Sequence, residues 1–577
     1  MNQPTPAIVA QSAARRLPRL YLLLICAAYV LPGFWVRSPW KGQDIEALGF
    51  MLQMAQPGMG ESLSWLKPTL LGSPDSNLAL LPYWLGALFV RLSPAGWEDL
   101  FARLPFMGML AATLASTWYA VHALNRHPAA QPVSFAFGGE AKPTDYARAM
   151  ADGGLLALLA CLGLARLSHE TSPALSQLCF AALLFFGLAS WSRHRIGSAA
   201  AVAAGMLGLT LSGAPTVALL LGLGGATVCA LGQPNPVQRR MSMLDLGLLA
   251  LMGLLCITTA GALDLWRWRV VPHTLLELHM LAKLIAWFTW PAWPLALWSL
   301  WRWRGQLSQV WRYPHLGLPL WFAAVTVGAT WFTGLSDRSL LTALPAIATL
   351  AALALPTLKR SLGALIDWFT LLFFSICALT IWVVWLAMQT GSPAAPARNV
   401  ARLAPEFVSE FSIHAFGLAL IATLAWGALV KWRTGDMPAA IWKSMVLPAG
   451  GAVLCWLLLT TLWLPLLDYA RSYAPLMAKV SQATNGSVCY QYAGISKAQG
   501  AALMHHAHAR LLPMQSPQED CPWLLVDQAN LSLLSAKVQS LGWVEQATLK
   551  RPTDKLETLV IFRPAQPFMT VPADAAR

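Results

Sequence analysis

The sequence predicts an all-α, polytopic membrane bundle of about 13 transmembrane helices, followed by a small α/β domain outside the cytoplasm. Of the 577 residues, 56% are hydrophobic and only 11% are charged, whereas soluble proteins carry about 25% charged residues. The charge is also uneven, because residues 468–577 hold 10 basic and 8 acidic residues while residues 1–467 hold 30 and 18. We therefore divide the chain into a transmembrane domain, 1–467, and a water-soluble domain, 468–577.

Apolar segments of spanning length follow one another along the first domain. The first runs from Leu20 to about Trp35, and no small-residue cleavage site follows it, so we expect a retained helix and not a signal peptide. The other predicted spans lie near 104–124, 152–168, 173–192, 197–212, 215–232, 243–262, 282–301, 316–334, 340–358, 367–388, 411–430 and 443–466.

Basic residues between the spans predict the orientation. If the short apolar segment 77–92 does not cross the membrane, five basic clusters lie on the side of the N-terminus, and the positive-inside rule makes that side cytoplasmic. If it crosses, all five become external. We therefore predict an interfacial helix at 77–92, with Tyr83 and Trp84 at headgroup level. The clusters are Arg193/Arg195, Arg239/Arg240, Arg302/Arg304/Arg312, Lys359/Arg360 and Lys431/Arg433/Lys443.

This orientation leaves few segments outside the cytoplasm. They are the first loop at 36–103, the short segments 168–172, 212–215 and 336–339, the loops 263–281 and 389–410, and the tail. Residues 125–151 are predicted to be a cytoplasmic insertion.

The tail has the short alternating segments of an α/β domain. We expect strands near 486–493, 521–529, 542–550 and 557–565, and helices over 497–512 and 531–541. Cys489 and Cys521 are the two cysteines of the tail. Outside the cytoplasm they either form a disulfide with each other or remain two free thiols.

Charged groups on the external side are scarce, which makes each of them informative. In the first loop, Asp44 and Glu46 precede a helix-like segment, so either chemistry or interaction with a helix N-terminus explains them. Two interpretations of Arg338 are open. It forms an interfacial ion pair with Asp337, or it binds a phosphate. The remaining candidates are His169, Glu170, His273, Glu277, His279 and Lys283.

The spacing of these residues does not favour a metal site. His273 and His279 are six residues apart, which does not place two ligands on one helix face, although His273/Glu277 and His279/Lys283 are each four apart. We predict no metal ligands, and only polar loop contacts for His169, His273, Glu277 and His279.

The first loop resembles that of bacterial polyprenyl-phosphate-sugar glycosyltransferases of the GT-C fold, the aminoarabinose transferase and protein O-mannosyltransferase-like group (glycosyltransferase family 39). A W-x-x-P-x-L-x-G segment precedes the interfacial helix, and an "ARLP" segment opens the second span. The matching residues are Trp65, Pro68, Leu70, Gly72, Pro82, Tyr83, Trp84 and Ala102–Pro105, with later echoes at 208–215, 290–297 and 339–353.

The resemblance implies an inverting glycosyltransferase of the bacterial inner membrane, with a cytoplasmic N-terminus and a periplasmic C-terminal domain. It moves a sugar from a polyprenyl-phosphate donor to lipid A, an envelope glycan or a protein; membrane lipids surround it, and nucleic acid is no partner. Asp44 matches the leading acid of the family and is the expected general base. Glu46 is displaced by one from the second acid, and Glu170 lies near the acid of the second loop. The resemblance implies no obligatory cofactor, and it leaves open whether a divalent cation takes part.

Two family lysines are absent from this chain. The family has one of these lysines just before the interfacial helix, where this chain has Ala79–Leu81. It has the other at the position where this chain has Ser212 and Gly213. Arg338, Lys67 or Lys283 would then bind the donor phosphate, with Tyr83, Trp84 and the loop 263–281 shaping the donor site. The missing lysines keep two alternatives open: a transporter or flippase for a lipid-linked substrate, and a catalytically silent relative that binds polyprenyl phosphate.

Overall fold

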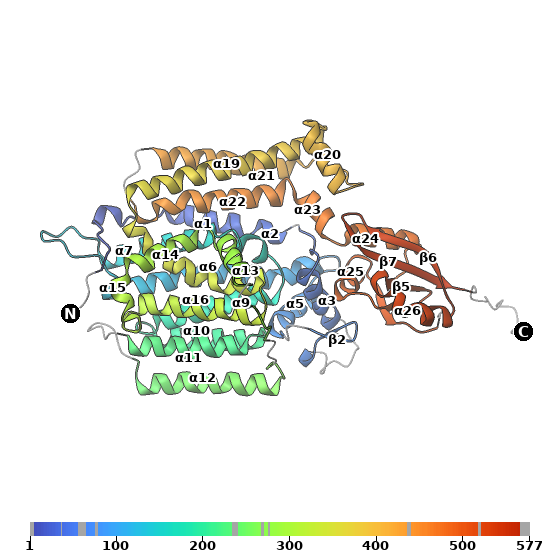
Figure 1. The fold of residues 1–577 in the computed structure, drawn as a ribbon, viewed down its shortest axis with the longest axis horizontal. Coiled ribbons are helices and arrows are strands. Elements are labelled where there is room, and N and C mark those ends of the chain that lie inside the picture. Colours follow the sequence, from blue (N-terminus) through green and yellow to red (C-terminus); the bar gives the residue numbers. More distant parts are fainter. Residues whose placement is uncertain are drawn as a thin grey trace, which may run out of the picture.

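The structure is a computed structural model. It describes residues 5–565 apart from residue 36 and segments 56–64, 76–78, 233–240, 267–269, 275–276, 436–439 and 517–520. The helices of the first domain lie side by side in one bundle, and the sheet of the C-terminal domain lies beyond one end of it (Figure 1). Helix α15 (Arg304–Leu307), from one of the basic clusters, lies at the opposite end. Arg239 and Arg240 fall outside the described residues.

Eight helical segments of the described chain are long and apolar enough to cross a membrane. They are α6 (Glu98–Asn125), α9 (Pro173–Ser190), α12 (Met243–Ala262), α16 (Pro314–Thr333), Asp337–Thr357 with α17 (Asp337–Leu340) and α18 (Leu344–Ala354), α19 (Arg360–Thr390), α21 (Ile413–Thr434), and Ile441–Thr461 with α22 (Val446–Thr461). The predicted helical membrane bundle is confirmed, whereas the count of 13 crossings stays a prediction.

Other predicted spans are shorter helices or broken ones. They are α1 (Arg19–Val30) with α2 (Pro32–Trp35), α7 (Pro143–Ala160) with α8 (Leu164–Leu167), α10 (Arg195–Leu211), α11 (Pro215–Leu231), and α13 (Leu278–Phe288) with α14 (Ala292–Arg302). The span expected at 282–301 is interrupted because Pro291 cannot donate a helical hydrogen bond. The span expected at 152–168 instead begins at Pro143, inside the predicted cytoplasmic insertion, since proline suits the first helical turn.

The first loop folds into a layer between the bundle and the C-terminal domain (Figure 1). It contains α3 (Gln43–Ala55), the short antiparallel pair β1 (Thr69–Leu70) and β2 (Ser73–Pro74), and α5 (Leu81–Arg91). With 11 residues, α5 is about 16 Å long, half of the roughly 30 Å of a bilayer core. This length fits the predicted interfacial helix and excludes a crossing.

The C-terminal domain contains a five-stranded sheet of order β4-β3-β5-β7-β6. Its elements are β3 (Cys489–Ala493), α25 (Lys497–His506), β4 (Arg510–Pro513), β5 (Trp523–Asp527), α26 (Gln528–Ser540), β6 (Trp543–Arg551) and β7 (Asp554–Pro564). Helix α20 (Ala394–Leu403) lies in the loop after α19, and α23 (Leu464–Arg471) and α24 (Ala474–Ala483) connect the bundle to the sheet.

The expected helix over 497–512 was too long. It ends at His506, and Arg510–Pro513 forms a strand parallel to β3. His508 adopts a positive φ of 48°, a conformation that a helix cannot contain. The four expected strands are therefore five, and Cys489 and Cys521 form a disulfide.

Close packing joins the C-terminal domain to the first loop. A Cβ built on Gly49 of α3 would lie 2.5 Å from the Cβ of Ala501 in α25, so the two helices touch where a side chain is missing. Lys41 adds ion pairs with Asp554 at 2.7 Å and with Glu557 at 2.8 Å. The C-terminal domain is thus fixed to the loop layer by helix packing and by ion pairs.

Candidate functional site

Asp44 lies at the centre of a buried polar network under the first loop. One carboxylate oxygen accepts hydrogen bonds from the backbone N–H of Trp40 at 3.0 Å and from Arg37 at 2.8 Å. The other accepts from the N–H of Thr171 at 2.8 Å and from its hydroxyl at 3.0 Å. Both oxygens are therefore occupied, and they are closed off from solvent because the side chain is only 1% exposed.

Two guanidinium groups determine the charge of Asp44. Burial by itself raises the pKa of its carboxyl, but the charges of Arg37 and Arg103 and the N–H groups of Thr171 and Trp40 outweigh burial and lower the pKa below its ordinary value. Arg37 also donates to the carbonyls of Gly33 and His169. Asp44 is therefore a buried anion that ties the first loop to the second.

Glu170 is held by Arg338. The guanidinium donates from Nε and Nη2 to Glu170, with distances of 2.8–3.1 Å. Burial raises the pKa of Glu170, the charge of Arg338 opposes the rise, and Asp44 adds to it. Arg338 itself is 27% exposed on its side chain. The side chain of Arg338 thus stays partly exposed in the pair, and Arg338 lines the cavity beside it.

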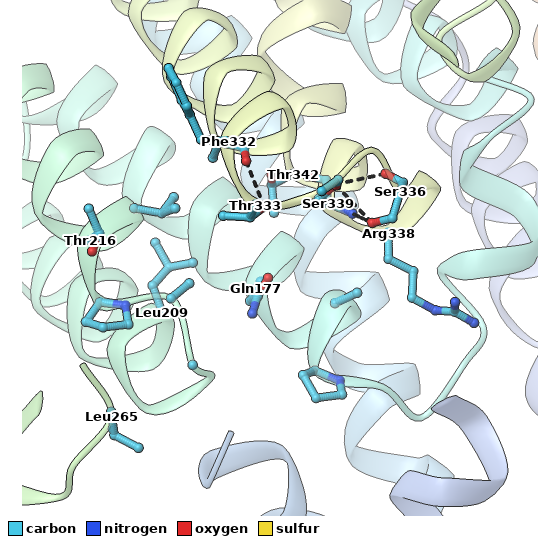
Figure 2. A pocket seen from close by; sticks show the side chains of 18 of the residues that line it. Gln177, Leu209, Thr216, Leu265, Phe332, Thr333, Ser336, Arg338, Ser339 and Thr342 are labelled. Atoms are coloured by element: carbon cyan, nitrogen blue, oxygen red, sulfur yellow. Dashed lines mark hydrogen bonds between the residues drawn. The ribbon is translucent and has the colours of Figure 1, made fainter. Parts of the chain in front are cut away.

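That cavity lies where the loops meet the bundle, and its volume is about 770 Å³. Arg338 and Lys497 line it together with Gln43, Pro74 and Asp75, and we call this set the cationic end. Figure 2 shows Arg338 on one side of the cavity and Leu209, Thr216 and Leu265 on the other.

The second side of the cavity is apolar and comes from α10, α11 and α16. We call its residues the apolar flank; they are Leu209, Leu220, Val325, Ala329 and Phe332. Leu220 and Phe332 are 46% and 54% exposed on the surface of the bundle. The apolar flank thus continues to the surface that faces lipid in a membrane.

Glu46 does not line the cavity itself but lies close enough to the cationic end to interact with its charges. In the first turn of α3 it is half-buried, and among the described residues it accepts no hydrogen bond. Burial raises the pKa of its carboxyl; Asp75 adds to the rise, whereas Lys497 and Arg338 oppose it. A carboxylate with a raised pKa and no fixed donor is suited to accept a proton.

Asp75 and Tyr83 form a pair at the same end. The Tyr83 hydroxyl lies close to the Asp75 carboxylate, and the Tyr83 ring stacks on Phe50 with centroids 5.1 Å apart. The backbone N–H of Ala79 also donates to Asp75 at 3.3 Å. Tyr83 therefore contributes to the cavity through Asp75, which lines it.

Several predicted residues lie elsewhere. Lys67 and Lys283 are exposed and do not line the cavity, and Trp84 is half-buried and donates to the carbonyl of Trp65. The ring of His169 is buried against Phe34 and Trp456, under Gly33. His273 pairs with Glu277 at 2.5 Å, four residues apart as the sequence suggested, and His279 is exposed. Of the loop 263–281, Leu265 and Trp266 line the cavity.

No group of three or more metal-ligating side chains occurs in the part of the chain that the structure describes. The acids of the site are instead placed against cations: Asp44 on Arg37, and Glu170 on Arg338. The arrangement can bind an anion at one end of the cavity and accept a proton beside it.

Solved structures of ArnT share this architecture. ArnT from Cupriavidus metallidurans in the apo state aligns with a TM-score of 0.59 at 12% identity, over 95% of this chain and 98% of that chain. The chain has the ArnT fold. The same protein bound to undecaprenyl phosphate gives a TM-score of 0.59 at 13% identity with the same coverage. An oligosaccharyltransferase from Archaeoglobus fulgidus aligns over 95% of this chain and 76% of that chain, with a TM-score of 0.41 at 10% identity. No protein-family model and no curated protein matches the sequence.

The ArnT likeness confirms the GT-C-like fold that the sequence motifs implied. Sequence reasoning missed Lys497 and gave Asp75 no role. The signal for Asp75 was its position just after the W-x-x-P-x-L-x-G segment, directly after β2. For Lys497, at the start of a helix in the other domain, the sequence contains no signal that it reaches the cavity.

Proposed function

We propose that this chain is a glycosyltransferase of the bacterial inner membrane that takes a sugar from a polyprenyl-phosphate donor at the periplasmic face. The observation that supports this most is the single cavity that joins a cationic end to an apolar flank. A polyprenyl-phosphate sugar has the same two parts, an anionic phosphate and a long apolar chain. ArnT, whose fold this chain has, was solved bound to undecaprenyl phosphate.

In this proposal the donor phosphate binds at Arg338, and the polyprenyl chain lies along the apolar flank toward lipid. Glu170 orients Arg338 through its two-point contact. The acceptor oxygen attacks the anomeric carbon of the sugar, the bond from that carbon to the phosphate oxygen breaks, and polyprenyl phosphate leaves with the electron pair. Arg338 stabilises the negative charge that develops on the phosphate.

We assign the general base to Glu46. It takes the proton of the acceptor hydroxyl, for which its raised pKa and lack of a fixed donor suit it. Asp44, the base implied by the family motif, is saturated by its partners and becomes a positioning residue that holds the first and second loops together. Asp75, beside Glu46 at the cationic end, shapes the acceptor side.

The predicted organisation is part of the proposal. The transmembrane domain comprises 1–467, with the first periplasmic loop at 36–103, and the periplasmic domain comprises 468–577. The N-terminus is cytoplasmic. An alkaline phosphatase reporter fused after Leu466 should be active, and one fused after Arg312 should be inactive; the reverse pattern would contradict the orientation.

The test of function is transfer of labelled sugar from polyprenyl-phosphate donors to lipid A, envelope glycans and proteins in membranes. Wild type should label one acceptor class, Glu46→Gln should lose at least about 100-fold in rate, within the usual range for a general base, and Asp75→Asn should lose less. Full transfer by Glu46→Gln with loss in Asp75→Asn would move the base to Asp75. No transfer from any donor would favour the transporter or silent alternatives.

A further inference from the structure

Lys497 belongs to the C-terminal domain but lines the cavity of the membrane domain. It is the first residue of α25, directly after the N-cap Ser496. Its ammonium group donates to the carbonyl of Pro74 in the first loop and lies 5.7 Å from the ring centroid of Phe50. Within the described residues it forms no ion pair with a carboxylate, whereas Arg338 is paired with Glu170.

The placement of Lys497 is rigid because α25 is packed tightly on the first loop. A Cβ on Gly500 would lie 2.7 Å from Leu71, just as one on Gly49 would meet Ala501. Ser496 and Gln499 form a reciprocal capping box that fixes the start of the helix. The ammonium group is therefore presented to the cavity by helix contacts and not by a free loop.

Charge balance gives Lys497 a function. Arg338 and Glu170 together carry no net charge, and Asp75 adds a carboxylate at the same end, so these three groups do not neutralise an added phosphate. A sugar phosphodiester carries one negative charge, and the monoester that leaves after transfer carries about 1.5 to 2. An additional cation at the same end of the cavity is needed most as the leaving group forms.

We propose that Lys497 binds the phosphate of the lipid-linked donor and stabilises the departing lipid phosphate, so that the C-terminal domain completes the donor site. Its ammonium group exchanges the carbonyl of Pro74 for a phosphate oxygen, a stronger, charge-assisted partner. Lys497 thereby replaces one of the two cations that the first loop and the turn 212–215 lack. This inference rests on the proposed function, and it gives the C-terminal domain a direct part in the chemistry.

The test measures binding of undecaprenyl phosphate and of undecaprenol to the full chain in nanodiscs, followed by tryptophan fluorescence. Lys497→Met should weaken undecaprenyl phosphate binding about 10- to 100-fold, the range of one charge-assisted hydrogen bond, and should leave undecaprenol binding unchanged. Lys497→Arg should keep most of the affinity. Lys537→Met, which removes an exposed lysine of the same domain, is the matched control and should bind as wild type does.

The outcomes separate this inference from the proposed function. If wild type binds undecaprenyl phosphate and Lys497→Met binds it equally well, the inference is wrong while the proposed function stands. If Lys497→Met loses affinity for undecaprenol as well, its role is structural and the inference fails. If wild type prefers neither lipid, the proposed function fails first. Unfolding curves for each variant check that α25 still docks, and Lys497→Arg provides the test even if the methionine variant unfolds.

Discussion

Replacing Asp44 with asparagine should destabilise the protein before it affects any chemical step. The carboxylate accepts four hydrogen bonds from Arg37, Trp40 and Thr171. An asparagine amide has one oxygen, so its NH₂ group must face either the Arg37 side or the Thr171 side, where the partners are also donors. Arg37 and Arg103, 1% and 3% exposed, would lose the anion that offsets their charge.

The magnitude follows from these contacts. Breaking a buried ion pair by removing one partner costs about 3–5 kcal/mol. Since Arg37 keeps the carbonyls of Gly33 and His169, we expect the lower end, about 3 kcal/mol, or a roughly hundredfold larger unfolded population. Because the pKa of Asp44 is lowered in the folded state, its stabilisation is complete above the ordinary aspartate pKa and is lost as the pH falls through the lowered value.

The assay is thermal unfolding of detergent-purified Asp44→Asn beside wild type and Glu46→Gln, with transfer measured on the same samples at a temperature where all are folded. The double variant Arg37→Met/Asp44→Asn should recover part of the lost stability, because the uncompensated guanidinium group is gone. Unchanged stability of Asp44→Asn together with abolished transfer would refute this reasoning and return the role of general base to Asp44.

Three other predictions test the site and the tail. The acid limb of kcat/KM should lie above the ordinary glutamate range, because burial raises the pKa of Glu46 and transfer requires its deprotonated form; a limb at an ordinary glutamate pKa in the pH–rate profile would contradict this. Arg338→Gln should reduce transfer about 100-fold, whereas Glu170→Gln, which leaves the cation in place, should reduce it less; equal losses in the transfer assay would place both residues in one structural unit. Cys489→Ser should lower the free energy of unfolding by about 4 kcal/mol, since the disulfide to Cys521 spans 32 residues; equal denaturation curves with and without reductant would show that the bond contributes nothing.

Much of the fold was predictable because hydrophobicity and charge act locally. The small number of charged residues indicated a membrane protein. The positions of the basic clusters indicated that 77–92 is an interfacial helix and not a span, and the 11-residue length of α5 supports this prediction. Boundaries were less predictable where proline acts: Pro143 begins a helix ahead of the expected span, and Pro291 divides another. In the tail, the strand at Arg510–Pro513 forms through its pairing with β3, and its own four residues carry too short a pattern to indicate it.

The candidate site, like the fold, was predictable from the sequence only in part. The sequence by itself predicted that the few charges outside the cytoplasm gather in the first loop, and its motifs resembled those of transferases that use a lipid-linked sugar donor. Only the tertiary structure decided which carboxylate is saturated and which cation meets the cavity. The bond from Thr171 to Asp44 joins residues 127 positions apart, and the contact of Lys497 with Pro74 joins residues 423 apart. Such contacts depend on how helices and domains pack, and no local pattern of residues encodes that packing.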